Sequence, residues 1–421
     1  MSPDPNPDFR PLLCADLELT APVAPTEIPD DAGLELLVRV QGDPVGTLIV
    51  EPSGTSSGIE SWCTQARQQF DNAITHHDQP LDAIGSWPRA VVSISTIGKH
   101  PLLPTAIRAL LDQDYAGEFE IVVVDNAPAN GLTPPIVESI GDSRITLVTE
   151  QIPGISAARN AAYRYALDSG ADIIAFTDDD ALADPGWLRN IGAVFAQDRA
   201  VGVVTGLVVP GSQMTRAEQL FEEGSGFNKG YVLTVWSTAP DTSGVWALGV
   251  KGDGGGMFPW AAGSFGSGNN MAFRVTDMKR IGSFDISLGA GTAAPGGDDL
   301  DAFVRFIVGG TTLIYEPRAI VRHFHRDSFD ALEKQMFGYG AGLSAYLVRE
   351  FLALPGAKGP MLKGVFRGVR HMFASDSEKN SSRTGTYPKE LARAELKGLM
   401  QGPWLYLKSR RQTKKRTSGR V

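Results

Sequence analysis

The chain has 421 residues, of which 42% are hydrophobic and 21% charged, and its net charge is −9. This is the composition of an ordinary globular protein, and the acidic balance excludes nucleic-acid binding through overall electrostatics. The length predicts a main domain with additions rather than one compact domain. The two cysteines, Cys14 and Cys63, form neither a metal-binding pattern nor a disulfide framework.

The sequence offers no targeting or membrane-spanning signal. The first residues, MSPDPNPDFRP, lack the basic flank and apolar core of a signal peptide. No run of about eighteen apolar residues occurs, so no spanning helix is predicted. We therefore expect a cytoplasmic protein.

Residues 1–86 differ in pattern from the rest of the chain. A lead rich in Pro and Asp precedes two β-like runs around Gln41–Pro44, which predict a hairpin, and a helix is expected from about Ile59 to Ile74. This pattern predicts a small α+β appendage. It contains no catalytic motif, and the sequence assigns it no role.

From Arg89 onward, apolar runs alternate with helical patterns. The runs are RAVVSIST, FEIVVVD, ITLVTE and ADIIAFT, and the helices between them are expected near Leu103–Leu111, after Thr133, and from Ser156, a predicted cap, to Gly170. Four strands interleaved with helices predict a parallel α/β sheet with right-handed crossovers.

The pattern then becomes less regular. A helix (GWLRNIGAVFAQD) and a strand (VGVVTGLVV) precede the Gly-rich segment 211–262, which is typical of a binding loop or lid. Its Trp236, Trp246 and Trp260 could stack on sugar rings or simply pack. TTLIYEP and AIVRHFHR predict two strands with a tight turn at Glu316–Pro317.

The region from about Phe329 is amphipathic and helical, and it ends in the basic run SRRQTKKRTSGRV. Such a run on an acidic protein has two interpretations. It is solvated disorder, or it attaches the protein to an anionic membrane beside helices that lie in the interface.

Three adjacent carboxylates, Asp178–Asp180, end the apolar run ADIIAF. Such side chains repel one another except in water, at a helix start or around a cation. Ligands of open α/β sheets bind at the carboxyl ends of strands, so this motif indicates a metal and ligand site. The alternative is that the three residues only open a turn.

An ordered set of motifs resembles the family-2 glycosyltransferases over roughly Arg89–Arg326. The set consists of VVSIST, the strand end at Asp125, the ARN helix start, FTDDD, GSGNN, GGDD and HFH. The resemblance implies a GT-A fold, a nucleotide-binding α/β sandwich with a mostly parallel sheet. The chain then divides into an appendage at 1–86, a catalytic domain at 87–328 and a helical tail at 329–421.

The resemblance implies a nucleotide-diphosphate sugar as donor and a divalent cation, Mn²⁺ or Mg²⁺, as cofactor, because hard oxygen ligands suit these ions. By the family's DxD motif, Asp180 contacts the metal and Asp178 lies by the metal or the ribose, while Asp179 shares either task. His323 completes the metal shell, with His325 as the second choice.

Four further residues are assigned to the donor by the same resemblance. Asp125 accepts a hydrogen bond from the base, unless it only caps a loop, and Thr96 contacts the nucleoside. Arg159, just inside a helix start, binds phosphate or is a surface residue. Asn270 is the polar contact of the loop that closes over the donor sugar.

The family's acidic motif before a helix places the general base at Asp299, while Asp298 positions the acceptor. Either acid could instead cap the helix. One base suffices for a single displacement, so the resemblance implies an inverting reaction.

We therefore expect a metal-dependent inverting glycosyltransferase that acts on a hydroxyl of a glycan or lipid-linked acceptor, as in cell-envelope polysaccharide biosynthesis. Its other expected partner is an anionic membrane, met peripherally through the basic tail, and no nucleic acid is expected. One alternative is a non-catalytic nucleotide-sugar or glycan-binding protein on the same fold. Another is a nucleotidyltransferase, which lacks support because no Gly-rich, basic motif follows the first strand.

Overall fold

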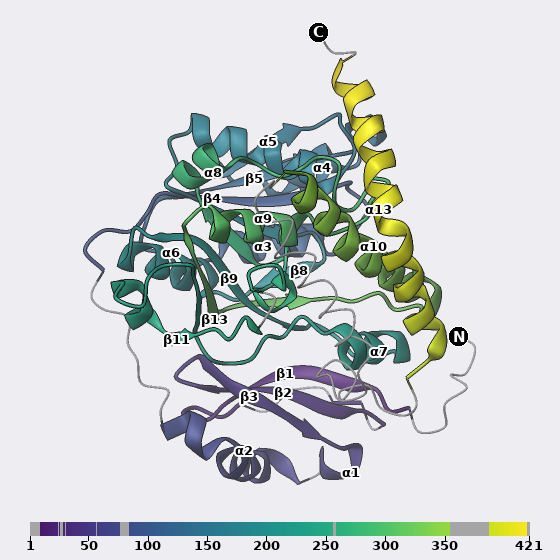
Figure 1. Cartoon of the computed structure of the whole chain (residues 1–421). Helices are drawn as coiled ribbons and strands as arrows, with labels where there is room; N and C mark the ends of the chain where they lie inside the picture. Colours follow the sequence, from purple (N-terminus) through teal and green to yellow (C-terminus); the bar gives the residue numbers. More distant parts are fainter. Residues whose placement is uncertain are drawn as a thin grey trace.

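The computed structural model describes residues 9–418 except for positions 24, 26–27, 30, 56, 76–83, 256–257 and 354–386. Three parts are distinguishable in Figure 1: a central sheet covered by helices, a small N-terminal sheet below it, and two long C-terminal helices along one side.

The central sheet has ten strands, nine of them in the order β11-β10-β13-β9-β12-β7-β4-β5-β6, with β8 paired to β13. The strands are β4 (Ala90–Thr96), β5 (Phe119–Asp125), β6 (Ile145–Thr149), β7 (Ile173–Asp178), β8 (Ala181–Ala183), β9 (Val201–Pro210), β10 (Thr234–Trp236), β11 (Val250–Lys251), β12 (Met271–Arg274) and β13 (Thr312–His323).

Strands β4, β5, β6 and β7 are parallel neighbours, and β9 and β13 run in the same direction. The short β12 lies antiparallel between β7 and β9. Because β12 runs the opposite way, the loop that precedes it reaches the same sheet edge as the carboxyl end of β7. Side chains from both segments therefore meet at this edge.

Helices cover both faces of the sheet. Val91 of β4 packs with α5 (Ile155–Asp168), α8 (Val275–Ile281) and α9 (Asp298–Val308) on one face. Ala90 and Val92 pack with α3 (Leu103–Leu111) and α6 (Trp187–Gln197) on the other, where α4 (Thr133–Ile140) also lies. Burial on both faces explains why these strands are nearly continuous apolar runs in the sequence.

The α/β fold with a large, mostly parallel sheet, a small N-terminal α+β unit and C-terminal helices is confirmed. Two local predictions were wrong. Residues 312–323 form one strand, in which a bulge between Glu316 and Ile320 replaces the expected tight turn. Ser156 does not cap α5, because the N-cap is Gly154 and the Ser156 hydroxyl donates to the Leu288 carbonyl at 2.8 Å.

The N-terminal unit contains β1 (Leu12–Glu18), β2 (Gly33–Val40), β3 (Asp43–Val50), α1 (Pro52–Thr55) and α2 (Gly58–Thr75). The predicted hairpin is β2–β3, and β1, which the sequence did not indicate, pairs parallel with β2. Leu37 packs against β9 and β13, and Arg39 forms an ion pair with Asp184 at 2.8 Å. The two described cysteines are free thiols.

The irregular segment contains a helix, α7 (Arg216–Ser225), whose start is closed by a capping box of Thr215 and Glu218. It also holds a 3₁₀ turn, η2 (Gly244–Leu248), and the two short strands β10 and β11, of which β11 is the edge strand. Part of the expected loop is therefore ordered, and α7 brings a helix to the sheet edge where β13 ends.

The C-terminal helices are α10 (Phe329–Ala353) and α13 (Lys389–Ser418), which lie side by side (Figure 1). They approach so closely that a Cβ at Gly398 would lie 2.0 Å from the Phe337 carbonyl oxygen. The predicted basic run is helical as far as Ser418, so the disorder interpretation fails there. The amphipathic stretch LKGVFRGVRHMF lies outside the described residues.

No helix among the described residues is both long enough and apolar enough to cross a membrane. The domain boundaries at residues 86 and 328 stay a prediction.

Candidate active site

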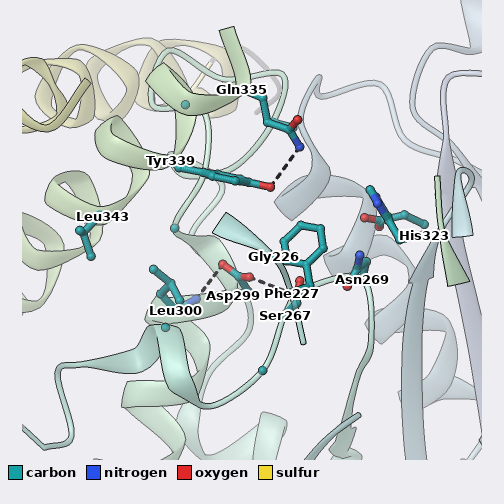
Figure 2. Close-up of a pocket in the computed structure, with 18 of the residues that line it drawn as sticks. Gly226, Phe227, Ser267, Asn269, Asp299, Leu300, His323, Gln335, Tyr339 and Leu343 are labelled. Carbon is teal, nitrogen blue, oxygen red and sulfur yellow. Dashed lines mark hydrogen bonds between the residues drawn. The ribbon is translucent and has the colours of Figure 1, made fainter. Parts of the chain in front are cut away.

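A cavity of about 1340 Å³ opens at the carboxyl ends of β7 and β13, between the start of α9, the end of α7 and one face of α10. It brings together six residues that the sequence predicted, namely Arg159, Asp178, Asp180, Asp298, Asp299 and His323. In Figure 2, Gln335 and Tyr339 project from α10 toward Asp299, while Asn269 and His323 lie across the cavity from Leu343.

Asp178 and Asp179 sit where β7 ends, as expected, but they face different partners. Asp179 leaves the cavity and accepts a hydrogen bond of 2.5 Å from the hydroxyl of Thr96. Asp178 lines the cavity, 3.5 Å from Arg159. Burial raises the pKa of Asp178 to about 7, against the opposing charge of Arg159 and with the support of Asp180.

Asp180 pairs with His323, the last residue of β13. The Nε2 atom of His323 lies 3.3 Å from Oδ1 of Asp180, and this Oδ1 has no hydrogen-bond partner. Burial opposes ionisation of Asp180, but the positive charge of a protonated His323 outweighs it and lowers the pKa of Asp180 to about 2. Both side chains are buried, so the pair is fixed in place.

His325 does not join this pair directly. Its Nδ1 lies 3.0 Å from Nδ1 of His323, and its Nε2 lies 2.6 Å from a carboxylate oxygen of Glu222 on α7. Both ring nitrogens are therefore engaged within the protein. These contacts do not favour His325 as a metal ligand, and its second-choice role stays a prediction.

Arg159 is buried rather than exposed, with its side chain in the interior near the start of α5. Its guanidinium donates to Asp298 at 2.5 Å and to the Gly268 carbonyl at 2.8 Å. These contacts use Nη1 and Nη2 and make Arg159 the counter-ion of Asp298 and Asp178. Its contact with phosphate stays a prediction.

The GGDD motif forms the start of α9. Gly297 has φ of +76°, and a Cβ there would lie 2.4 Å from the Gly342 carbonyl oxygen of α10, so glycine is required by both conformation and space. Asp298 then points inward to Arg159, and burial raises its pKa to about 6 despite that cation. Neither acid is the N-cap, which is Gly297.

Asp299 is the acid that faces the cavity. Its Oδ2 accepts the Gly268 backbone N–H at 2.9 Å and its Oδ1 accepts the Leu300 N–H at 2.8 Å, as drawn in Figure 2. Unlike Asp298, Asp299 has no ion-pair partner within the described residues. Its carboxylate therefore keeps lone pairs available toward the cavity.

The assignment of Asn270 needs correction. Asn270 is fully buried, and its amide donates to the Leu207 and Ala319 carbonyls while its oxygen accepts from Trp187. Its neighbour Asn269 lines the cavity, and neither atom of its amide has a partner. The polar contact predicted for Asn270 belongs by geometry to Asn269, because two adjacent Asn residues in a loop face opposite sides.

Thr96 and Asp125 are not among the residues that line the cavity. The Thr96 hydroxyl also accepts the Gly98 N–H at 2.8 Å. Asp125 is fully buried. Its Oδ1 accepts a hydrogen bond from the Ala127 N–H, and its Oδ2 has no hydrogen-bond partner. Their contacts with a nucleoside stay predictions.

The cavity residues that the sequence did not indicate include Glu222, Phe227, Gln335 and Tyr339. Gln335 donates to the Tyr339 hydroxyl at 3.0 Å, and its carbonyl oxygen is buried without a partner. They come from α7, the segment after it, and α10, for which no motif is available.

The donor atoms at the strand ends fit a divalent cation only in part. No group of three or more His, Cys, Asp or Glu side chains with metal-binding geometry occurs within the described ranges. Asp180 and His323 supply one oxygen and one nitrogen, which lie 3.3 Å apart. Such a pair fits an ion that takes its remaining ligands from water and substrate phosphates, as Mg²⁺ commonly does.

Residues 92–252 match the family model described as glycosyl transferase family 2. This match confirms the resemblance to family-2 glycosyltransferases, in the region that contains Asp178–Asp180. The pairs Asp298–Asp299 and His323–His325 lie beyond it.

An N-acetylglucosaminyltransferase of Mesorhizobium japonicum is 30% identical over 123 residues, which is 28% of this chain and 28% of that relative's length. A mannosyltransferase from Pyrobaculum calidifontis, solved with GDP-Man and Mn²⁺, is similar at 19% identity and a TM-score of 0.46, over 80% of this chain and 95% of that one. GalNAc-T7, solved with UDP, GalNAc and Mn²⁺, is similar at 15% identity and a TM-score of 0.43, over 65% of this chain and 52% of that one.

Proposed function

We propose that this protein is an inverting glycosyltransferase that moves a sugar from a nucleotide-diphosphate donor to a hydroxyl of a glycan or lipid-linked acceptor. The observation that supports this proposal is that one cavity contains both a candidate metal-binding pair and a separate candidate base. The Asp180–His323 pair lies at the strand ends, and the unpaired carboxylate of Asp299 lies at the start of α9. The family match over residues 92–252 supports glycosyl transfer as the class of reaction.

Asp180 and His323 are the residues that would hold a divalent cation, with Asp178 beside them. When bound, the cation would neutralise the diphosphate and favour its departure. Oδ1 of Asp180 is buried without a hydrogen-bond partner. Leaving such an oxygen unpaired lowers the stability of the fold, so this atom supports a bound ligand at the site.

Asp299 takes the proton of the acceptor hydroxyl as that oxygen attacks the anomeric carbon. The carboxylate of Asp299 accepts two backbone N–H groups and keeps its remaining lone pairs for the acceptor hydroxyl. Asn269 and Gln335 have unused amide atoms that can orient sugar hydroxyls, and Tyr339 offers an aromatic ring beside them. A single displacement needs one base, the role proposed for Asp299, and this agrees with inversion.

The experiment is a turnover assay of the full chain with Mn²⁺ and a panel of nucleotide sugars. We expect release of nucleoside diphosphate from one of them, and NMR of the product should show inverted anomeric configuration. Binding of a donor without release would instead support a non-catalytic nucleotide-sugar or glycan-binding protein. Release of pyrophosphate would identify a nucleotidyltransferase.

Peripheral membrane contact through α13 is part of this proposal. Leu396, Met400, Trp404 and Leu407 are spaced by four, four and three residues, so they share one face, and Met400 and Trp404 are 68% and 62% exposed. From residue 396 to 418 the helix carries seven basic residues and no acid. An apolar stripe with basic flanks is the pattern of a helix that lies in an anionic interface.

Flotation of the full chain with vesicles tests this contact. We expect binding to vesicles that contain phosphatidylglycerol and little binding to pure phosphatidylcholine. Trp404→Glu should reduce the binding severalfold, whereas Val23→Glu, at another exposed apolar site far along the chain, should not. Equal binding by the Trp404 variant would contradict the proposal.

A further inference from the structure

Four side chains form an unbroken line from the metal-binding end of the cavity to α7. Asp180 meets Nε2 of His323 at 3.3 Å, Nδ1 of His323 meets Nδ1 of His325 at 3.0 Å, and Nε2 of His325 meets Glu222 at 2.6 Å. The line spans three elements, the end of β7, the end of β13 and α7. Each contact restricts the hydrogens of the next.

The hydrogens can be placed by elimination, starting from Glu222. A carboxylate only accepts, so Nε2 of His325 carries the hydrogen of the 2.6 Å contact. A neutral His325 then has a bare Nδ1, which can only accept. The 3.0 Å contact therefore requires the hydrogen on Nδ1 of His323.

The consequence appears at the far end of the line. A neutral His323 with its hydrogen on Nδ1 has a bare Nε2, and this lone pair faces the partnerless Oδ1 of Asp180. These two electron-rich atoms are 3.3 Å apart, so a positive charge is favoured between them: a proton on Nε2 when no metal is bound, or a metal cation that displaces this proton. Hydrogen bonds that fix the tautomer of a metal-binding histidine in this way raise metal affinity.

We propose that Glu222 and His325 are positioning residues that lock His323 in the tautomer whose Nε2 binds a divalent cation. The inference deepens the proposed function and rests on it for the purpose of the cation. Neither residue touches the cation, because both nitrogens of His325 are occupied. The ring of His325 is also held in place by Phe221, with ring centres 4.3 Å apart.

The first measurement is the tautomer itself, read from imidazole ¹⁵N shifts of the full chain without metal at a pH where the histidines are neutral. The chain has six histidines, and variants of His323 and His325 identify the two signals. We expect Nδ1–H for His323 and Nε2–H for His325. A His323 found with its hydrogen on Nε2 would overturn the proposal.

The second measurement is the affinity for Mn²⁺, followed by the EPR signal of free Mn²⁺ with and without UDP or GDP. Glu222→Gln should raise the dissociation constant by about 10- to 100-fold and disturb the His325 tautomer. Glu222→Asp keeps the charge, so its dissociation constant for Mn²⁺ should lie between those of Glu222→Gln and the parent protein. Glu333→Gln removes the same charge from an exposed position of α10 and serves as the control.

His325→Phe keeps the ring and its packing but removes the acceptor for His323, so it should weaken Mn²⁺ binding as well. Unchanged Mn²⁺ affinity in both Glu222→Gln and His325→Phe would refute the positioning role even if sugar transfer occurs. Absence of transfer with any donor, together with the expected tautomers and affinities, would refute the proposed function and leave the positioning role standing.

Discussion

The cavity has two walls of different construction. The strand wall consists of the ends of β7 and β13, with Asp178, Asp180 and His323, and hydrogen bonds to neighbouring strands fix these ends. The helix wall consists of the end of α7, the start of α9 and one face of α10, which come from separate parts of the chain. Close glycine contacts and buried ion pairs hold the helix wall.

The difference teaches where charge matters for stability. In the strand wall, charged groups sit on a frame that apolar strands already stabilise, so their loss should affect binding more than folding. In the helix wall, some charges are buried against one another. Removing one partner of a buried pair leaves the other without compensation, which is strongly destabilising.

Asp299→Asn is the change with the largest expected effect, and it should separate the two walls by function. Transfer should fall by about 10²- to 10⁴-fold, because the amide cannot accept the acceptor's proton. Affinity for nucleoside diphosphate and Mn²⁺ should stay within about twofold, since those ligands belong to the strand wall. Single-turnover kinetics and calorimetry measure the two quantities.

The control for Asp299 is Asp330→Asn, which removes an exposed carboxylate at the first turn of α10. It should leave both quantities as they are. Full transfer by the Asp299 variant would move the base to another residue and remove the functional contrast between the walls.

Arg159→Met tests a side chain that joins the walls, since Arg159 contacts Asp178 in one and Asp298 in the other. The free energy of unfolding should fall by about 3 to 5 kcal/mol, the usual cost of leaving a buried charge unpaired. Urea unfolding followed by circular dichroism measures it.

Adding Asp298→Asn to the Arg159 variant removes the stranded charge and should restore part of the loss. A double variant that is less stable than Arg159→Met alone would show that the pair is not the cause of the destabilisation.

Glu350→Gln has the smallest expected effect and depends on pH. Glu350 of α10 is fully buried, and burial, followed by the charge of Asp301, raises its pKa to about 7 although Arg349 opposes the rise. The unfolded chain ionises this group near pH 4.5, so the folded state holds an extra proton between pH 4.5 and 7. Stability from this group is therefore complete below pH 4.5 and falls as pH rises to 7.

The glutamine resembles the protonated acid and carries no such penalty. Relative to the parent, Glu350→Gln should gain stability with rising pH over that window, by at most about 1.4 kcal/mol per pH unit. Urea unfolding of both proteins at about pH 5, near the lower end of the window, and at about pH 8, above it, gives the difference in their free energies of unfolding. A difference that does not change with pH would place the proton elsewhere in the Asp301–Glu350–Arg349 cluster.

The strand wall was largely predictable from sequence, and the reason is local. Apolar runs that end in Asp125 or Asp178–Asp180 indicate strands and their carboxyl ends without knowledge of distant contacts. The helix wall was predictable only at GGDD, where a motif marks a helix start. Glu222 and Tyr339 carry no local signal, because their position depends on how α7 and α10 pack.

The differences between sequence and structure have the same origin. Asn270 and Asn269 are equivalent in sequence, and only the contacts with Leu207, Ala319 and Trp187 show which one is structural. His325 resembles a ligand in HFH, and only the structure shows its contact with Glu222, 103 residues earlier. Arg159 resembles a phosphate ligand, and only the structure shows Asp298 beside it.

The antiparallel strand β12 has a consequence for synthesis of the chain. Strands β4 to β7 can pair as soon as they leave the ribosome, because their partners are near in sequence. The other edge of β7 stays open until Met271 and its neighbours arrive to pair with Phe176. In that interval the nascent chain exposes an apolar strand edge, so we expect chaperone binding to concentrate there.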